Sequence, residues 1–366
     1  MITCSFDETF TYEEIYKAHL RGRASKRDRR SLVRFEMFEL DNLYRLYQNV
    51  HNGYRIKEYN KFLVYEPKLR EIQTLHYRDR IVQHVLCDRI LTPYFTQRAV
   101  IDNCVCQIGK GMHFALERFE ERLKKFARNH KQNGYVLKCD ILKYFPSLSH
   151  EVLEKLICSH IKDERIRALV SHIIDSFHTK PDYLAKYGIE SLGEGSKTGR
   201  GVPIGNQTSQ VFGMFYLDKM DRLIKEKWRV KIYSRYMDDF VLVHEDKQFI
   251  KRLLVDIRKM AKELKVNLNS KTQIFPIKNG LTYLGFRYQV TKDGKVIKKV
   301  ATNTVKRFYR RTNLLNKAYY DGVIGIDRII QSLTAFHGHI KHGDCFKLEH
   351  RLVKRIKVPL QYLKKG

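Results

Sequence analysis

The spacing of apolar residues along the chain predicts a mixture of helices and short strands. Apolar positions recur every three or four residues, as on the buried face of a helix, in 81–91, 114–126, 152–161, 207–224 and 249–264. Short β-rich runs predict strands at 54–59, 61–65, 135–141, 230–236, 240–244, 281–288 and 295–300. Residues 177–201, rich in Gly, Lys and Ser, predict a loop, and the chain beyond 303 reads as basic helix. This mixed order favours an α+β fold.

Composition narrows the class of protein. A chain of 366 residues with 43% hydrophobic residues can bury a core in two or three packing units. Lys and Arg total 70 against 40 Asp and Glu, a net charge of +30, so a polyanionic partner is expected and nucleic acid is favoured. Seven scattered cysteines without a CxxC pair indicate neither a disulfide framework nor a zinc ribbon. With no long apolar run, we expect no membrane span and a cytoplasmic location.

The tetrapeptide Tyr236-Met237-Asp238-Asp239 carries the sharpest chemical signal. It lies between two β-rich runs, so its acids are expected at or beside a hairpin turn. Adjacent carboxylates repel each other unless a cation lies near them. That cation could be a Lys or Arg side chain or Mg²⁺, and an ordinary turn rich in Asp is the structural alternative.

A second acid strengthens the interpretation of a metal site. Asp140 ends the apolar run 135–141, and an acid at a buried strand end needs a partner. If this strand pairs beside the 236–239 hairpin, Asp140, Asp238 and Asp239 come together. Three carboxylates around two Mg²⁺ ions are the components of phosphoryl or nucleotidyl transfer.

These residues fall in an order that resembles the reverse transcriptases, over about residues 55–290. Asp140 with Phe145 is similar to the first palm motif of that family, and Tyr236–Asp239 to its YxDD motif. Four further segments are similar to the remaining motifs: Lys68-Leu69-Arg70 in the fingers, 79–83, 268–272 and Tyr283-Leu284-Gly285-Phe286. The resemblance implies a right-hand polymerase fold, with fingers, a palm of antiparallel sheet plus helices, and a helical thumb.

The resemblance also implies a role for individual residues. Asp140, Asp238 and Asp239 would be catalytic, and together with Ile141 they would hold two Mg²⁺ ions. Lys68 and Arg70 would neutralise triphosphate oxygens. Phe145 would pack under the sugar and exclude a 2′-hydroxyl, with plain core packing as the alternative. Lys271 would approach the pyrophosphate, although a solvated lysine fits its position nearly as well.

The segment 202–210 points to a subfamily. Its Ile204-Gly205 and Gln210 resemble the corresponding positions in the reverse transcriptases of diversity-generating retroelements. Most group II-like and retroviral enzymes have Gln-Gly and Ser-Pro at these places. Ile204, Gly205 and Gln210 would then lie beside the nascent base pair. The implied function is RNA-directed synthesis of adenine-mutagenised cDNA from a template-repeat RNA. Another bacterial reverse transcriptase, of retron, group II intron or phage-defence type, remains open, as does a non-catalytic RNA-binding protein.

The same resemblance sets the expected domains and partners. We predict a basic N-terminal extension over 1–50, fingers over 51–130, a palm with interleaved fingers helices over 131–290 and a helical thumb over 291–366. The implied partners are template-repeat and spacer RNA, cDNA, dNTPs and a small basic accessory variability protein. Two basic proteins need a local acidic patch or shared RNA to associate. The oligomeric state stays open.

Overall fold

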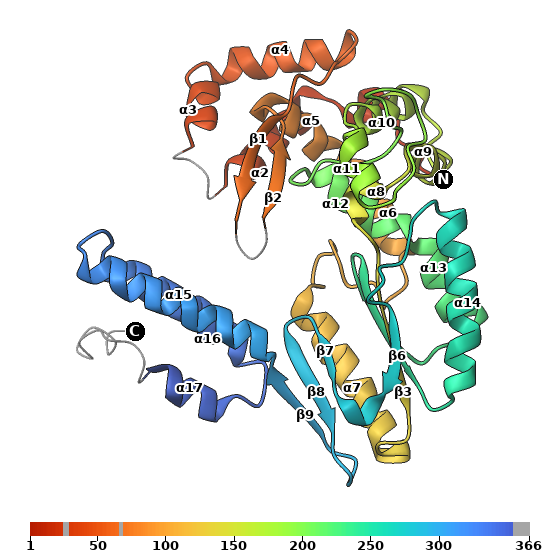
Figure 1. Cartoon of the computed structure of the whole chain (residues 1–366). Coiled ribbons are helices and arrows are strands. Elements are labelled where there is room, and N and C mark those ends of the chain that lie inside the picture. Colours follow the sequence, from red (N-terminus) through yellow and green to blue (C-terminus); the bar gives the residue numbers. More distant parts are fainter. Residues whose placement is uncertain (25–28, 66–68, 354–366) are drawn as a thin grey trace. The chain divides into compact units, whose positions relative to one another are not determined.

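The computed structural model describes residues 1–24, 29–65 and 69–353 and divides into two compact units (Figure 1). The first unit consists of residues 1–111, 138–240 and 251–272. The second consists of residues 112–137, 241–250 and 273–366. The predicted boundaries of extension, fingers, palm and thumb stay a prediction.

Helices make up most of both units. In the first half of the chain they are Phe6–Thr9 (α1), Tyr12–Arg23 (α2), Arg30–Glu36 (α3), Glu39–His51 (α4), Tyr77–Leu86 (α5), Thr92–Arg98 (α6), Met112–His130 (α7), Tyr144–Ser147 (α8), His150–Cys158 (α9) and Glu164–Asp175 (α10). They continue with Pro181–Lys186 (α11), Gln207–Tyr216 (α12), Asp218–Arg222 (α13), Lys247–Glu263 (α14), Thr302–Tyr320 (α15), Ile326–Ile340 (α16) and Phe346–Val353 (α17). Two π-helical turns, Cys87–Leu91 and Leu223–Lys227, extend α5 and α13.

The strands form three sheets in the described part of the chain. They are Asn60–Val64 (β1), Arg70–Thr74 (β2), Tyr135–Asp140 (β3), Ile232–Tyr236 (β4), Asp239–His244 (β5), Gln273–Pro276 (β6), Leu281–Tyr283 (β7), Phe286–Val290 (β8) and Val296–Val300 (β9). Their orders are β1-β2, β4-β5-β3-β6 and β7-β8-β9. β1 pairs antiparallel with β2, and β8 pairs antiparallel with both its neighbours. Helices and antiparallel strands in mixed order confirm the predicted α+β class.

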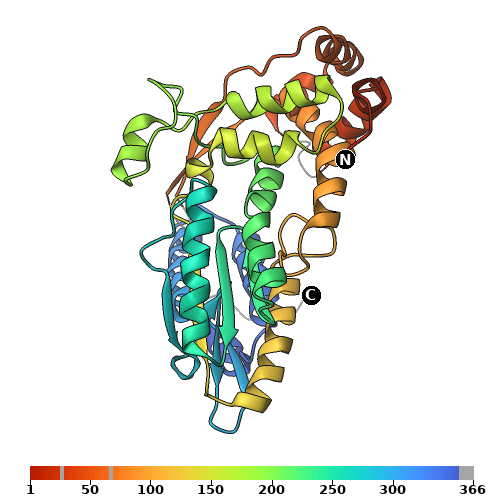
Figure 2. The same cartoon turned by 90° about the vertical axis from the view of Figure 1, so that its right-hand side faces the viewer.

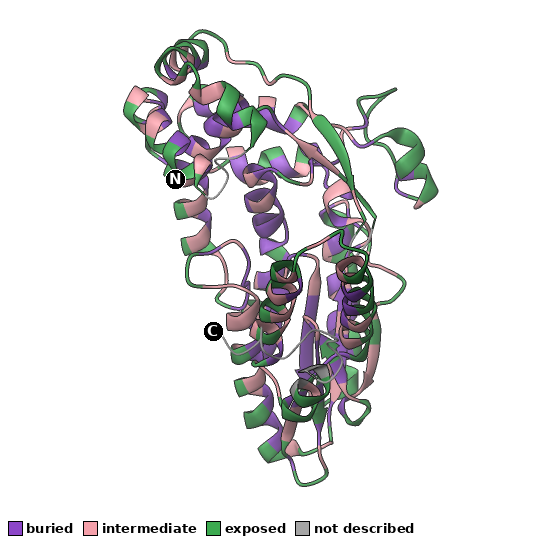
Figure 3. Ribbon diagram, turned by 90° about the vertical axis from the view of Figure 1, so that its left-hand side faces the viewer, coloured by how far each residue is buried: buried purple, intermediate pink, exposed green. Residues whose placement is uncertain are grey.

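Helix α12 lies at the centre of the first unit. Six successive residues, 211–216, are buried, and the helix packs against α5 and α9 (Figure 3). Helices α9 and α10 lie side by side in the same unit (Figure 2). Gly213 allows a close approach within α12, because a Cβ there would meet the Phe145 ring at 3.2 Å. The buried helix thus brings the Phe145 ring and the end of β4 into one packed layer.

The second unit builds two layers of its own. Helix α7 packs against β9, and its Phe119 ring contacts Tyr283 and Tyr288 of the β7-β8-β9 sheet. Helices α15 and α16 lie side by side, with Phe308 stacked on Phe336 at 3.7 Å (Figure 1). Ile329 is the buried centre of a small apolar cluster between them. An amphipathic helix over a three-stranded sheet is the expected way to bury both apolar faces.

Two predicted strands differ from the structure. Residues 54–59 are outside any strand, because the N–H groups of Ile56 and Lys57 donate to the side chains of His172 and Asp79 instead of to a neighbouring strand. The run 281–288 is broken into β7 and β8 by Leu284 and Gly285, both with positive φ (45° and 84°). The predicted loop 177–201 also contains the short helix α11.

Two general features need only brief mention. All seven cysteines lie in the described ranges, and none of them forms a disulfide. Among the helices of residues 1–24, 29–65 and 69–353, none is both long enough and apolar enough to cross a bilayer.

Candidate active site

The turn between β4 and β5 positions the two adjacent acids of the tetrapeptide 236–239. Tyr236 ends β4, Asp239 begins β5, and only Met237 and Asp238 connect them. Met237 has a φ of 58°, a left-handed conformation that L-residues with long side chains rarely adopt. The tight turn holds both carboxylates at the end of a strand pair whose other residues are mostly buried.

Asp140 lies next to this turn, at the end of β3. β5 and β3 are neighbours in the sheet, and the Ile141 N–H donates to the Asp238 carbonyl at 3.3 Å. Asn269 holds Asp140 from the other side: its N–H donates to the Asp140 carbonyl at 2.7 Å and its Nδ2 to Oδ2 at 2.9 Å. The structure therefore brings Asp140, Ile141, Asp238 and Asp239 together, as the hairpin argument expects.

Burial and mutual repulsion shift the acidity of the pair. The pKa of Asp238 is raised to about 6, first by burial and then by the neighbouring charges of Asp140 and Asp239, with Arg70 acting in the opposite direction. The pKa of Asp239 is also raised to about 6 by burial, and Lys138 partly offsets this increase. Carboxylates with pKa values this high are short of positive charge in their surroundings.

Lys138 is a nearby cation that sequence reasoning missed. Its Nζ lies 3.7 Å from Oδ2 of Asp239, and the other oxygen, Oδ1, is buried and receives no hydrogen bond from the described residues. Lys138 and Asp140 are two apart in β3, so their side chains leave the same face of the sheet. That spacing was the available signal.

The donor set fits a hard divalent cation. Carboxylate oxygens are the ligands that such ions prefer, and the unbonded Oδ1 of Asp239 is an acceptor in need of one. Among the described residues, the groups with all ligand atoms within 4.8 Å of one another are His150–Asp175–His178 and His19–Glu36–Glu39, so the three aspartates stand further apart than these. Such spacing is expected of buried like charges, which repel each other.

Comparison with known proteins decides the family. Residues 60–288, more than half of the chain, match the family described as reverse transcriptase (RNA-dependent DNA polymerase). This chain belongs to the reverse transcriptase family. It is also 23% identical over 254 residues to the protein YkfC of Escherichia coli (strain K12), which covers 60% of this chain and 63% of that protein. The chain thus spans less than two thirds of that relative's length.

Arg70, one of the residues predicted to hold the nucleotide of this reverse transcriptase, has a charge that reaches the acids. It begins β2, is exposed, and lowers the pKa of Asp238. Lys68 lies outside the described residues. Lys271 is exposed, and its N–H donates to Oδ1 of Asn269 at 3.1 Å, so its backbone is tied to the residue that holds Asp140.

Phe145, the predicted sugar-facing residue of this reverse transcriptase, is half-buried in α8. Its ring packs on Tyr144 and against the helix backbone at Gly213, and its carbonyl accepts from the Val202 N–H at 3.0 Å. This last bond joins α8 to the segment 202–210. The ring is therefore packed against these neighbours and is only partly exposed to solvent.

The segment 202–210 borders a cavity in this reverse transcriptase. The Ile204 carbonyl accepts from the Gln73 N–H at 3.1 Å, which ties the segment to β2. Gly205 has a φ of 124°, which favours glycine, and a Cβ there would also make a tight contact with Ile72 at 3.1 Å. Gly205 and Gln210 line a cavity of about 280 Å³ together with residues of α2 and α5, which include Tyr77, Arg80, Gln83 and His84.

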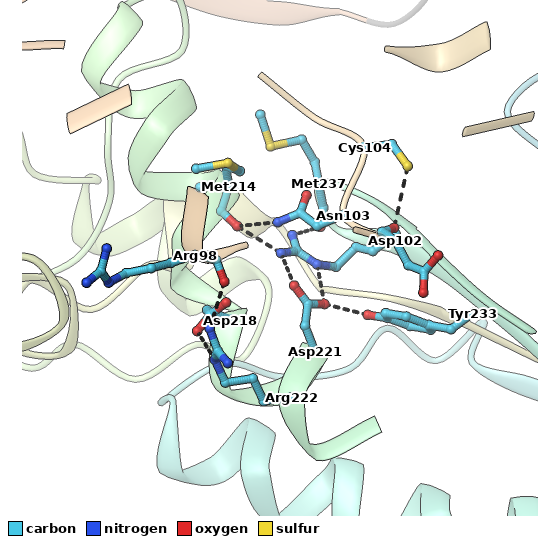
Figure 4. A network of polar contacts seen from close by, with 12 residues as sticks. Arg98, Asp102, Asn103, Cys104, Met214, Asp218, Asp221, Arg222, Tyr233 and Met237 are labelled. Carbon is cyan, nitrogen blue, oxygen red and sulfur yellow. Dashed lines mark hydrogen bonds and ion pairs between the residues drawn. The ribbon is translucent and has the colours of Figure 1, made fainter. Parts of the chain in front are cut away.

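A buried polar network underlies the Asp238 turn. Arg235 is fully buried and donates to both oxygens of Asp221 (2.7 and 2.6 Å) and to the carbonyls of Met214 (2.8 Å) and Met237 (2.9 Å). Figure 4 shows the Met214 carbonyl, the Asp221 carboxylate and the Tyr233 hydroxyl directed at this network, while the Met214 side chain extends away from it. Sequence reasoning missed it, although an arginine inside an apolar strand run is itself a signal, because a buried charge must be paired.

Proposed function

We propose that this reverse transcriptase is an RNA-directed DNA polymerase of a diversity-generating retroelement. The observation that carries the catalytic part is the meeting of Asp140 with the Asp238–Asp239 turn inside the region that matches the family. Both acids of the turn have a raised pKa, so the binding of divalent cations would stabilise their charged forms. This supports a cation site at the turn.

The proposed chemistry is nucleotidyl transfer with two Mg²⁺ ions. Asp140, Asp238 and Asp239, with the backbone of Ile141, would hold the ions. When bound, the ions would lower the pKa of a primer 3′-hydroxyl and neutralise the leaving pyrophosphate. Asn269 keeps the Asp140 carboxylate oriented, and Lys138 limits repulsion at Asp239 until that carboxylate is ligated.

Other residues of the chain would select and bind the nucleotide. Arg70, with Lys68 from the same motif, would neutralise triphosphate oxygens. Phe145 would present the exposed part of its ring to the sugar, so that a 2′-hydroxyl is excluded and dNTPs are preferred. Lys271 would stand near the pyrophosphate as it leaves.

The retroelement assignment rests on Ile204, Gly205 and Gln210. An isoleucine side chain cannot hydrogen-bond to the templating pair as a glutamine can, which is consistent with weak control over incorporation opposite adenine. The assignment brings template-repeat RNA and a small basic accessory variability protein as proposed partners. Association of two basic proteins would then depend on RNA shared between them.

Primer extension by the full-length chain tests both levels of the proposal. With a defined RNA template, dNTPs and Mg²⁺, the protein is expected to make cDNA, and Asp238→Asn is expected to make none. Sequencing of the cDNA then decides the subtype. Errors concentrated opposite template adenines support the retroelement role, while an even error spectrum favours a retron, group II intron or phage-defence enzyme. RNA binding without any synthesis would overturn the polymerase proposal and leave a non-catalytic RNA-binding protein.

A further inference from the structure

A strained turn and a buried cation meet directly behind the proposed catalytic acids. Met237 has a φ of 58° and its side chain is buried, so the turn combines an unfavourable backbone conformation with a large apolar side chain. Such a conformation persists only when surrounding groups hold it. The Met237 carbonyl accepts a hydrogen bond from Nη1 of Arg235 at 2.9 Å.

Arg235 is itself held rigidly from three directions. Its Nε and Nη2 donate to the two oxygens of Asp221, a bidentate pair in which both side chains are fully buried. Nη2 also donates to the Met214 carbonyl in α12, which accepts a second bond from Asn103 at 3.2 Å. The Tyr233 hydroxyl also donates to Asp221 at 2.6 Å, a bond that does not involve the guanidinium.

The backbone of Arg235 is anchored as well as its side chain. Its N–H donates to the Asp102 carbonyl at 3.0 Å, and its carbonyl accepts from the Cys104 N–H at 3.2 Å. With Nε and Nη2 fixed by their partners, the planar guanidinium keeps the two N–H groups of Nη1. One of these donates to the Met237 carbonyl, one residue before Asp238.

We propose that Arg235 is a positioning residue that holds Met237 in its left-handed conformation and so fixes where the Asp238 carboxylate stands. The proposal rests on the proposed function and deepens it. Arg235 would touch neither nucleotide nor metal. Its effect would pass through one carbonyl, and it would be felt in catalysis because a misplacement of about 1 Å at reacting groups can lower a rate by roughly a hundredfold.

The first test removes the network without leaving a buried charge behind. Replacing a buried ion pair by apolar residues of similar volume is often neutral or stabilising. The double variant Arg235→Met with Asp221→Leu is therefore expected to keep a thermal midpoint near that of the wild type. We expect its kcat for dNTP incorporation to fall roughly tenfold to a hundredfold, with a change in KM of less than about threefold. Its affinity for Mn²⁺, followed by electron paramagnetic resonance without substrate, should also fall.

The second test asks whether the turn is the route of the effect. Glycine adopts positive φ readily, so Met237→Gly should let the turn form without the Arg235 bond. In the Met237→Gly background, removal of the network should change kcat by less than about threefold. Tyr233→Phe serves as the matched control, because it removes a bond to Asp221 but leaves the Met237 bond in place, and it should keep wild-type kcat and Mn²⁺ affinity.

The outcomes separate this inference from the proposed function. If the wild-type chain makes cDNA and Asp238→Asn makes none, the proposed polymerase function holds, whatever the result for Arg235. Wild-type kcat and Mn²⁺ affinity in the double variant, or an equal loss of kcat with and without Met237→Gly, would overturn the positioning role. If the double variant does not fold, Arg235→Lys is measured by the same three readouts and against the same expectations.

Discussion

Two acidic sites, Asp221 in α13 and the Asp238–Asp239 pair that follows β4, have opposite surroundings. Asp221 is fully buried, with two bonds from Arg235 and one from Tyr233. Asp238 and Asp239 are only partly buried, their pKa values are raised to about 6, and Lys138 approaches Asp239 only to 3.7 Å. The complete set of partners is typical of a carboxylate that supports the fold, and the incomplete set is what the proposed cation site requires.

The largest expected effect comes from replacing Asp238, one of the two carboxylates with a raised pKa. Asp238→Asn should lower the rate of dNTP incorporation at least about 10³-fold, because a metal-holding carboxylate is lost. The thermal midpoint at pH 7 should stay the same or rise, because a buried charge with a raised pKa is removed. Primer extension and thermal denaturation check the two halves. Substantial synthesis by the variant would contradict the assignment.

The matched site should respond in the reverse sense. Asp221→Ala leaves the Arg235 guanidinium buried without its partner, so the free energy of unfolding should fall by about 3–5 kcal/mol. Denaturant titration measures this change. A loss no greater than that from an exposed control such as Asp293→Ala, whose side chain pairs with Lys295 at the surface, would show that the two sites do not differ as described.

A smaller effect is expected from Asn269, which orients the Asp140 carboxylate by a hydrogen bond and is not itself a proposed metal ligand. Asn269→Ala removes the Nδ2 donor to Asp140, and a supporting group of this kind changes metal affinity or activity by roughly tenfold to a hundredfold. Activity measured over a range of Mg²⁺ concentrations should show a higher half-saturating concentration. Asn279→Ala, at an exposed asparagine outside the 268–272 segment, is the control and should behave as the wild type.

The mildest test changes only pH. Since the pKa values of Asp238 and Asp239 lie near 6, protonation should raise the Mg²⁺ concentration needed for synthesis as pH falls from 7.5 to 5.5. Without divalent ions, a fall in pH is instead expected to stabilise the folded chain. The folded pKa values exceed those of the unfolded chain, so stability should increase as pH falls through about 6, by on the order of 1–2 kcal/mol. The variant Asp238→Asn with Asp239→Asn should lack this increment, and its persistence there would assign it to other groups.

The parts of the fold and of the candidate site that depend on local sequence pattern were predictable from the sequence. Asp140 at the end of an apolar run and Asp238–Asp239 between two such runs mark strand ends, and strand ends that pair bring acids together. The amphipathic stripes of α7 and α14 have the period of a buried helix face, so these helices were also predictable.

Other parts depend on contacts that no local pattern specifies. Asn269 lies 129 residues from Asp140, and Arg235 lies 14 from Asp221, so only the folded chain reveals which partner each has. The non-strand conformation of 54–59 has a similar origin, because side chains of His172 and Asp79 take its backbone donors. Long-range satisfaction of polar groups overrides β propensity at such places.

Gly213 lies behind Phe145, the residue proposed to contact the sugar of the nucleotide. A methyl group added there would press on the Phe145 ring at 3.2 Å from inside α12. A substitution at Gly213 would therefore change the tilt of the Phe145 ring, and with it the tolerance for bulkier or ribose-bearing nucleotides. No residue that faces the nucleotide would have to be changed.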